Sequence, residues 1–311
     1  MKPDVRHSAT HAAVWRVLMG VFGAVWLVNA AFQAEAWLVV PSARANFLGA
    51  ISKPIAHVPN AVRPLLRAVL LGVKALGPGL VAACMVAIAI LIGLALLTRT
   101  KLAFVCRFGI VYSLVCWIVL NGFGFPYSNG QTDPGVFVAY AIAFLFVLAV
   151  DGQSRGVSDV GHPARNRLWD AARLSFGGLW LFDAALKWLP AFLLHFTSQI
   201  TSVIPGQPHW IAVWLGFVAQ IIHLVGPILV AVLVGVVEIA IAVGLLTGRS
   251  LRLVIPFGIL YSLAVWSTAE GFGGPYSTAG TGVRGNVLGN VLIYLIPFLF
   301  LWARQREPTS G

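Results

Sequence analysis

A segment of 21 residues occurs twice in this chain, at a fixed spacing of 149 residues. Residues 108–128 read FGIVYSLVCWIVLNGFGFPYS and residues 257–277 read FGILYSLAVWSTAEGFGGPYS, so that 13 of the 21 positions are identical. An internal repeat of this length predicts two structural units that share one fold. Because equivalent positions meet the same packing requirement, a polar residue that occurs in only one unit needs a reason beyond folding.

The composition of the chain places both units in a lipid bilayer. Hydrophobic residues make up 59% of the sequence and charged residues 10%, and the mean hydropathy is +0.88. The apolar runs are close to the ~20 residues that cross a bilayer as a helix. We count eight such runs, at about 14–34, 77–97, 103–120, 135–150, 169–188, 227–247, 251–269 and 286–303. The predicted fold class is therefore an all-α, polytopic membrane helical bundle.

Four spans in each unit predict a parallel repeat, because an even number returns the chain to the side from which it started. The predicted domains are a first four-helix repeat at residues 1–150, a cytoplasmic linker at 151–170 and a second four-helix repeat at 171–311. Four prolines in the loop at residues 35–76 indicate short amphipathic or re-entrant pieces on the outer surface.

Lysine and arginine predict the orientation of the bundle. Fourteen of the 21 lie in the N-terminal segment, the 98–107 loop, the central linker, the 248–252 loop and the C-terminal tail. The positive-inside rule makes these segments cytoplasmic, so both ends of the chain are predicted on the cytoplasmic side of a prokaryotic inner membrane. Topology and anionic lipid account for the net charge of +11, and no nucleic-acid module is present. The expected partners are membrane lipid and either another protein or a second copy of this chain.

The two units differ in where they carry charge. Aligning their helices pairs neutral residues of the first unit with charged residues of the second: Asn29 with Asp183, Gln33 with Lys187, Ala89 with Glu238 and Asn121 with Glu270. A charge inside hydrocarbon costs ~2.5–3.5 kcal/mol on insertion scales, so such groups pair, line a wet cavity or serve a function. The fold does not require these charges, because the first unit packs without them.

Four residues of the second unit are therefore predicted to form a catalytic site: Asp183, Lys187, Glu238 and Glu270. Asp183 and Lys187 lie one helical turn apart, which predicts an ion pair in the outer half of the bilayer. Glu270 lies at the outer end of its span and Glu238 lies deeper. The excess of negative charge predicts a protonated Glu238 that carries protons. The alternative is that these residues only stabilise the bundle.

Further residues near the outer surface are predicted to contact a substrate. A flat quinone could stack on Trp266 or Tyr276, Arg284 could attract an anion, and His223 lies near a span entrance. No metal site is expected, because the outer histidines do not form a pair inside the membrane. Three other aromatic residues, Trp15, Trp169 and Trp302, are predicted to form an inner interfacial belt.

The arrangement of each unit resembles a known family. The second unit has a charged motif late in its first helix, FGGLWLFDAALKW at residues 176–188. The aromatic and glycine turns are followed by GQTD at residues 130–133 and by GTG at residues 280–282. These features resemble the DoxX/DoxD group of small four-helix membrane proteins, here in tandem. The resemblance implies quinone-linked sulfur oxidation, as in thiosulfate:quinone oxidoreductase, or a membrane assembly that handles oxidative stress. Gly282 replaces Asp133 of the first unit, which leaves open which unit retains the family's site.

The sequence thus predicts a quinone-associated redox subunit that handles a small reductant or oxyanion at the outer face. Whether the chain is itself an enzyme stays open, and a quinone is its possible cofactor. Two alternatives remain: a small-solute transporter built from parallel repeats, for which buried charges are equally natural, and a non-catalytic scaffold subunit. No phosphate-binding glycine loop is present, which excludes an ATP-driven function.

Overall fold

The computed structural model describes residues 5–124, 133–155, 163–273 and 289–306, and within these ranges the chain is all-α, with no strand. The first half consists of α1 (Val5–Ala34), η1 (Glu35–Val39), α2 (Ala43–His57), α3 (Arg63–Leu76), α4 (Pro78–Thr98), α5 (Leu102–Asn121), η2 (Gly122–Gly124) and α6 (Val136–Arg155). The second half consists of α7 (Pro163–Lys187), α8 (Pro190–Leu194), α9 (Phe196–Thr201), α10 (His209–Val225), α11 (Pro227–Thr247), α12 (Leu251–Ser267), η3 (Gly271–Gly273) and α13 (Asn290–Gln305).

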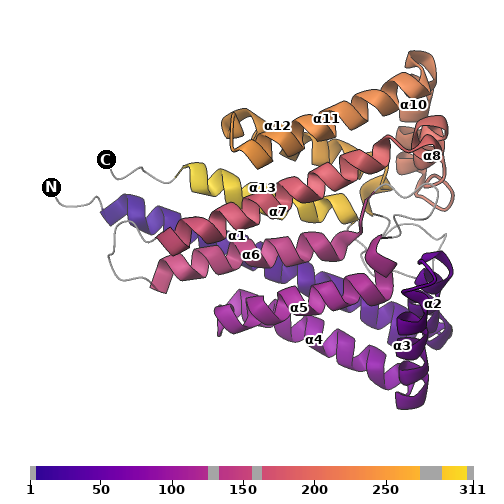
Figure 1. The fold of residues 1–311 in the computed structure, drawn as a ribbon, viewed down its shortest axis with the longest axis horizontal. Helices are drawn as coiled ribbons and strands as arrows, with labels where there is room; N and C mark the ends of the chain where they lie inside the picture. The colour runs from indigo at the N-terminus through magenta and orange to yellow at the C-terminus, as the bar shows by residue number, and fades with distance from the viewer. Residues whose placement is uncertain (1–4, 125–132, 156–162, 274–288, 307–311) are drawn as a thin grey trace.

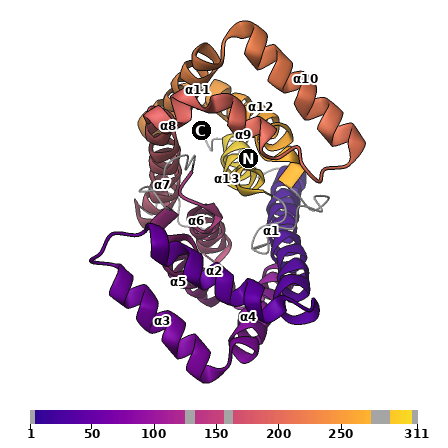
Figure 2. The same ribbon diagram turned by 90° about the vertical axis from the view of Figure 1, so that its right-hand side faces the viewer.

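The long helices run side by side along one axis (Figure 1). Helix α1 begins and α13 ends at one end of the bundle, and the helices α2, α3, α8 and α10 lie at the other end. Viewed from that other end, α2 and α3 cover one side and α8, α9 and α10 cover the opposite side (Figure 2). The two halves pack in the same way, since α1 lies along α4 and α7 lies along α11.

Four described helical segments are long and apolar enough to cross a membrane: Ala13–Val39, Pro78–Thr98, Leu102–Gly124 and Pro227–Thr247. Four shorter apolar segments accompany them: Val136–Gly152, His209–Val225, Leu251–Ser267 and Asn290–Gln305. Large apolar side chains such as Phe104, Leu224 and Leu253 are exposed on the outside of the helices. An apolar exterior of this kind is typical of a protein that is surrounded by lipid.

Two sequence predictions about the helices need correction. The eight predicted segments do not include α10, an apolar helix of 17 residues. The predicted linker at 151–170 is shorter, because α6 continues to Arg155 and α7 begins at Pro163. Proline is well tolerated in the first turn of a helix, where its missing N–H has no intrahelical partner to lose. Pro163 therefore starts a helix and does not interrupt one.

Four aromatic rings meet in the core, where the helices of one half face those of the other. Trp15 of α1 lies 5.8 Å from Trp169 of α7 and 5.8 Å from Phe300 of α13, between ring centroids. Phe146 of α6 lies 5.6 Å from Trp169 and 6.0 Å from Phe300. We refer to these residues as the four-ring cluster. Trp15 and Trp169, which are predicted to lie in an interfacial belt, are both buried between helices of the protein, and their depth in the membrane stays a prediction.

A close contact between a glycine and a phenylalanine ring occurs once in each half. A Cβ atom on Gly109 of α5 would lie 2.5 Å from the ring of Phe144 of α6. Gly258 of α12 faces the ring of Phe298 of α13 in the same manner. Only glycine leaves room for such an approach. In both halves of the chain, the helix that carries the repeated segment therefore packs closely against the next long helix.

Candidate functional site

A cavity of about 210 Å³ lies between α7, α11, α12 and α13, and residues of the short helices α8 and α9 also line it. We refer to it as the acidic cavity. It is lined by Asp133, Trp180, Asp183, Lys187, Phe192, Phe196, Gln199, Ile200, Val234, Glu238, Tyr261, Val265, Thr268, Ala269, Glu270, Val291 and Tyr294. The four residues that the sequence predicts as catalytic are all in this lining. The structure thus brings Asp183, Lys187, Glu238 and Glu270 together, and their catalytic role stays a prediction.

Lys187 forms an ion pair across two helices. Its Nζ atom lies 3.3 Å from Oε2 of Glu238 on α11, and the two side chains are only 9% and 6% exposed. The hydroxyl of Tyr261 donates a hydrogen bond of 2.9 Å to the other carboxylate oxygen, Oε1 of Glu238. The sequence predicts a pair between Lys187 and Asp183, which are one turn apart on α7. The flexible lysine stem carries the ammonium group to the neighbouring helix, and Asp183 still interacts electrostatically with it.

Asp183 has a different environment from Glu238. Its side chain is 4% exposed, and its Oδ1 atom has no hydrogen-bond partner among the described atoms. The hydroxyl of Tyr294 lies beside the Asp183 carboxylate. A buried polar atom without a partner costs about 1–3 kcal/mol, so it is a place where a ligand would be bound favourably.

Asp133 reaches the acidic cavity from the first half of the chain. Its Oδ1 atom accepts hydrogen bonds from the side-chain amide of Asn290, at 3.0 Å, and from the backbone N–H of Gly135, at 2.7 Å. Sequence reasoning singles out the GQTD turn but assigns Asp133 to the first unit. The two halves therefore share one site, to which the first half contributes a carboxylate.

Glu270 holds the beginning of α13. Its Oε1 atom accepts hydrogen bonds from the backbone N–H groups of Asn290, at 2.8 Å, and Val291, at 3.2 Å. The free N–H groups in the first turn of a helix carry partial positive charge, which stabilises a carboxylate. Glu270 thus acts as a helix cap at the edge of the acidic cavity, whatever further role it has.

Glu270 also predicts a pH dependence of stability. Burial, and then the nearby Asp133 carboxylate, raises the pKa of Glu270 to about 8, although the N–H donors of α13 oppose this effect. An unfolded glutamate has a pKa of about 4.3, so between these values the folded state binds more protons than the unfolded state. Stability conferred by the protonated group is therefore lost as the pH rises from about 4.5 to about 8. We expect the melting temperature of the detergent-solubilised protein to fall over this range.

The control for this prediction is Glu270→Gln, which retains an oxygen to accept the N–H groups of α13 but does not titrate. Its melting temperature is expected to vary less between pH 5 and pH 8 than that of the unchanged protein. Differential scanning fluorimetry at constant ionic strength provides the comparison. Parallel curves for the two proteins would show that Glu270 has an ordinary pKa.

The described residues that the sequence predicts to contact a substrate do not line the acidic cavity. His223 is exposed on α10 and does not line the acidic cavity. Trp266 is also absent from the lining, and its ring packs edge-on against Phe272 at 5.2 Å. Trp117 packs against Phe123 in the same way at 5.3 Å, so this contact belongs to the shared fold. Tyr276 and Arg284 lie outside the described residues.

The equivalent place in the first half is filled. Its free volume is about 10 Å³, and it is lined by Trp26, Asn29, Gln33, Met85, Tyr112, Cys116, Leu120, Phe137 and Tyr140. At the positions of Val234, Ala269 and Val291 the first half has the larger Met85, Leu120 and Phe137. The side-chain amide of Asn29 donates a hydrogen bond to the hydroxyl of Tyr140. The second half is thus both more charged and more open than the first.

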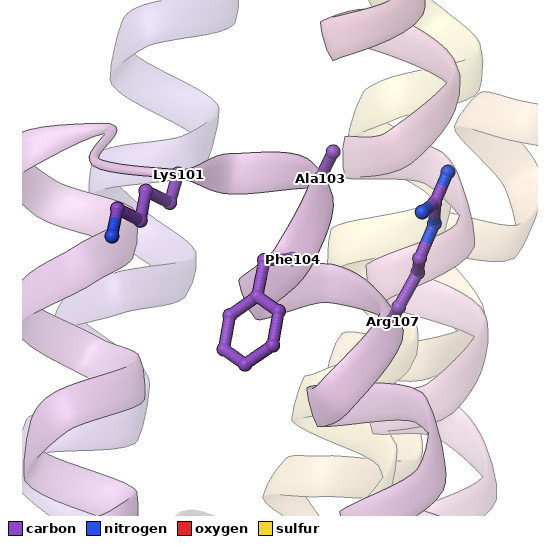
Figure 3. Close-up of a pocket in the computed structure, with 4 residues that line it drawn as sticks. All are labelled: Lys101, Ala103, Phe104 and Arg107. Carbon is purple, nitrogen blue, oxygen red and sulfur yellow. The ribbon is translucent and has the colours of Figure 1, made fainter.

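A larger hollow of about 650 Å³ lies at the beginning of α5, lined by Lys101, Ala103, Phe104 and Arg107 (Figure 3). The cationic ends of Lys101 and Arg107 lie on either side of the Phe104 ring and do not converge. Lysine, arginine and an exposed aromatic ring are typical of a surface that meets lipid headgroups. We therefore place the candidate functional site in the smaller acidic cavity, where buried polar groups face one another.

The fold and the apolar exterior define a helical membrane protein. Comparison of the chain with protein-family models, curated proteins and solved structures finds no match. Its function is therefore argued from the geometry of the acidic cavity.

Proposed function

We propose that this chain is an eight-span protein of the cell membrane, built from two parallel four-helix repeats, with both ends on the cytoplasmic side. The main helices would be α1, α4, α5 and α6 in the first repeat and α7, α11, α12 and α13 in the second. Three observations support this arrangement: the packing of α1 on α4 matches that of α7 on α11, the glycine and phenylalanine contact recurs, and α1 begins where α13 ends.

The function that this geometry supports best is proton-coupled transport of a small solute through the second repeat. The observation that carries the proposal is the difference between the halves. The acidic cavity has a volume of about 210 Å³ and is lined by ionisable side chains. The matching place in the first half has a free volume of about 10 Å³ and lacks acidic and basic side chains. The neutral side chains of the first half fill this space, so the fold does not require an open and charged cavity. The cavity of the second half therefore indicates another role, such as ligand binding.

Glu238 is the residue that we assign to proton exchange. It lies between the ammonium group of Lys187 and the hydroxyl of Tyr261. A proton that arrives on Glu238 would weaken its attraction to Lys187 and release the ammonium group toward Asp183. Protonation would thus change the charge that a solute meets in the acidic cavity, which is the requirement for coupling.

A quinone-linked redox subunit is the second candidate function. It is favoured by the aromatic walls formed by Trp180, Phe192 and Phe196, and by the indole N–H of Trp180, which is buried without an acceptor among the described residues. A quinone ring could lie against these walls and take protons from Glu238, while a partner protein supplied electrons. The indole N–H of Trp26 lacks an acceptor in the same way, however, so this feature belongs to both halves. Binding of a small oxyanion is disfavoured, because four carboxyl side chains line the acidic cavity and one lysine faces them.

The test is to identify what the protein holds. Protein purified in mild detergent is extracted, and small molecules are compared by mass spectrometry among the unchanged chain, Asn29→Ala, and the double variant that combines Lys187→Met with Glu238→Gln and so leaves no unpaired charge. We expect a compact molecule to co-purify with the unchanged chain and with Asn29→Ala, and to be depleted at least tenfold in the double variant. In proteoliposomes that contain a pH-sensitive dye, a gradient of that molecule should move protons in the same two proteins only.

Each other outcome has a defined meaning. A bound quinone, together with reduction of a soluble quinone analogue by thiosulfate in the presence of the protein, would replace the transporter with the redox subunit. Equal extraction from all three folded proteins, with no proton movement, would overturn both candidates and leave a structural ion pair.

A further inference from the structure

We propose that the ligand of the acidic cavity is a compact organic cation, a protonated amine or a quaternary ammonium group, and that Asp183 is the carboxylate that contacts it. This inference rests on the proposed function and names the chemical class of the solute. It follows from the balance of charge in the cavity, from a carboxylate oxygen that accepts no hydrogen bond from the described residues, and from the way in which the cavity already holds one ammonium group.

The described lining contains more negative than positive groups. Asp133, Asp183 and Glu238 supply three carboxylates, Glu270 supplies a carboxyl group whose pKa is raised to about 8, and Lys187 supplies one ammonium group. Asp133 and Glu270 accept hydrogen bonds at the beginning of α13. Glu238 is compensated by the ammonium group of Lys187 and by the hydroxyl of Tyr261. Asp183 has Lys187 and Tyr294 nearby, but its Oδ1 atom accepts no hydrogen bond from the described residues.

One carboxylate oxygen of Asp183 accepts no hydrogen bond in the described part of the chain. This Oδ1 atom is buried and belongs to the cavity lining, and the hydroxyl of Tyr294 lies beside the same carboxylate. A ligand that brings an N–H donor or a positive charge would satisfy the carboxylate oxygen. Bonds of this charge-assisted kind are about twice as strong as neutral ones, so Asp183 selects a cation over a neutral donor.

Lys187 shows how the cavity accommodates an ammonium group. Its Nζ atom lies 3.3 Å from a carboxylate oxygen of Glu238 and 5.4 Å from the centre of the Phe192 ring. A cation over an aromatic ring is attracted by the negative face of the ring, most strongly where water is excluded. Asp183 offers a second carboxylate to the same cavity, whose walls include the rings of Trp180 and Tyr294.

The walls favour an organic cation over a metal ion. Calcium takes six to eight oxygen ligands, and magnesium usually keeps several waters. No group of three or more histidine, cysteine, aspartate or glutamate side chains in the described ranges could hold a metal ion. Aromatic side chains contact a methylated or alkylated nitrogen well and a hydrated metal ion poorly. The volume of about 210 Å³ is below the ~300–1,000 Å³ that is usual for drug-sized ligands, which limits the ligand to a small molecule.

The experiment measures binding of tetramethylammonium chloride to the purified full chain in mild detergent. Tryptophan fluorescence reports binding because Trp180 lines the cavity, and ionic strength is held constant. tert-Butanol serves as the uncharged probe of similar shape, and sodium chloride as the metal-ion probe. We expect saturable binding of tetramethylammonium alone, weakened at least tenfold by Asp183→Asn and unchanged by the matched first-half variant Asn29→Ala. If Asp183→Asn is not recovered in folded form, Tyr294→Phe tests the same place and should weaken binding several-fold.

The remaining outcomes separate this inference from the proposed function. Saturable binding of tert-butanol or sodium with equal affinity would overturn the organic cation but leave a solute site. Binding of tetramethylammonium that neither Asp183→Asn nor Tyr294→Phe weakens would overturn the role of Asp183. Absence of probe binding, in a protein from which a neutral molecule is extracted, would overturn the cation alone. Absence of both would overturn the cation and the transporter together.

Discussion

Replacement of Lys187 by methionine is expected to remove most of the folded protein. The substitution leaves the buried carboxylate of Glu238 without its ammonium partner, 3.3 Å away in the unchanged chain. Loss of one member of a buried ion pair costs roughly 3–5 kcal/mol, which is a large part of the stability of a typical domain. The yield of monodisperse protein in detergent and its melting temperature provide the measurement.

Two further variants make this prediction specific to the ion pair. Adding Glu238→Gln to Lys187→Met removes the unpaired charge and should recover a large part of the yield. The matched first-half variant Gln33→Met removes only neutral hydrogen bonding, worth about 1 kcal/mol per bond, and should be tolerated. If Lys187→Met is as stable as the unchanged chain, the ion pair contributes nothing to folding.

Closing the acidic cavity is expected to abolish ligand binding and leave the fold intact. The triple variant Val234→Met, Ala269→Leu and Val291→Phe gives the second half the side chains that close the first. The same backbone arrangement already accepts these side chains in the first half, so overpacking should be small. The amount of co-purifying molecule, and the proton movement that it drives, should fall at least tenfold, as measured by mass spectrometry and by dye-loaded proteoliposomes.

The reciprocal change provides the control. Leu120→Ala in the first half should open a cavity there, without creating a ligand site, because Asn29 remains neutral. Because Leu120 is only half-buried, this change should cost less than the ~2–5 kcal/mol of a fully buried leucine-to-alanine change. If the triple variant folds and still holds its ligand in normal amount, the acidic cavity is not the binding site.

The repeated segments of the sequence help to predict the fold, and the positions at which the two halves differ in charge help to predict the site. Hydrophobic composition predicts helices, and the helices are present. The contrast between neutral and charged partners selects Asp183, Lys187, Glu238 and Glu270, and the structure places all four around one cavity. This succeeds because aligned positions in the two halves occupy equivalent places, so that a difference in sequence becomes a difference at one location.

Other features depend on contacts between the halves, which no alignment of one half with the other can reveal. Asp133 reaches the acidic cavity only because the start of α13 lies near the turn that precedes α6. Trp15 and Trp169 match the pattern of an interfacial belt, but the packing of the two halves buries them. The partner of Lys187 was also missed, because the length of its side chain allows contact with either α7 or α11.

The four-ring cluster bears on how such a site could arise. Trp15 and Trp169 are 154 residues apart, as are Phe146 and Phe300, so the rings that join the halves are equivalent pairs. Two separate copies of one unit could associate through the same rings, since a symmetric interface brings equivalent residues together. In such a dimer every charge would be present twice, and both cavities would need to be open or both closed. Joining the two copies in one chain removes that constraint, so that one half can specialise in chemistry while the other retains the tight packing that holds the molecule together.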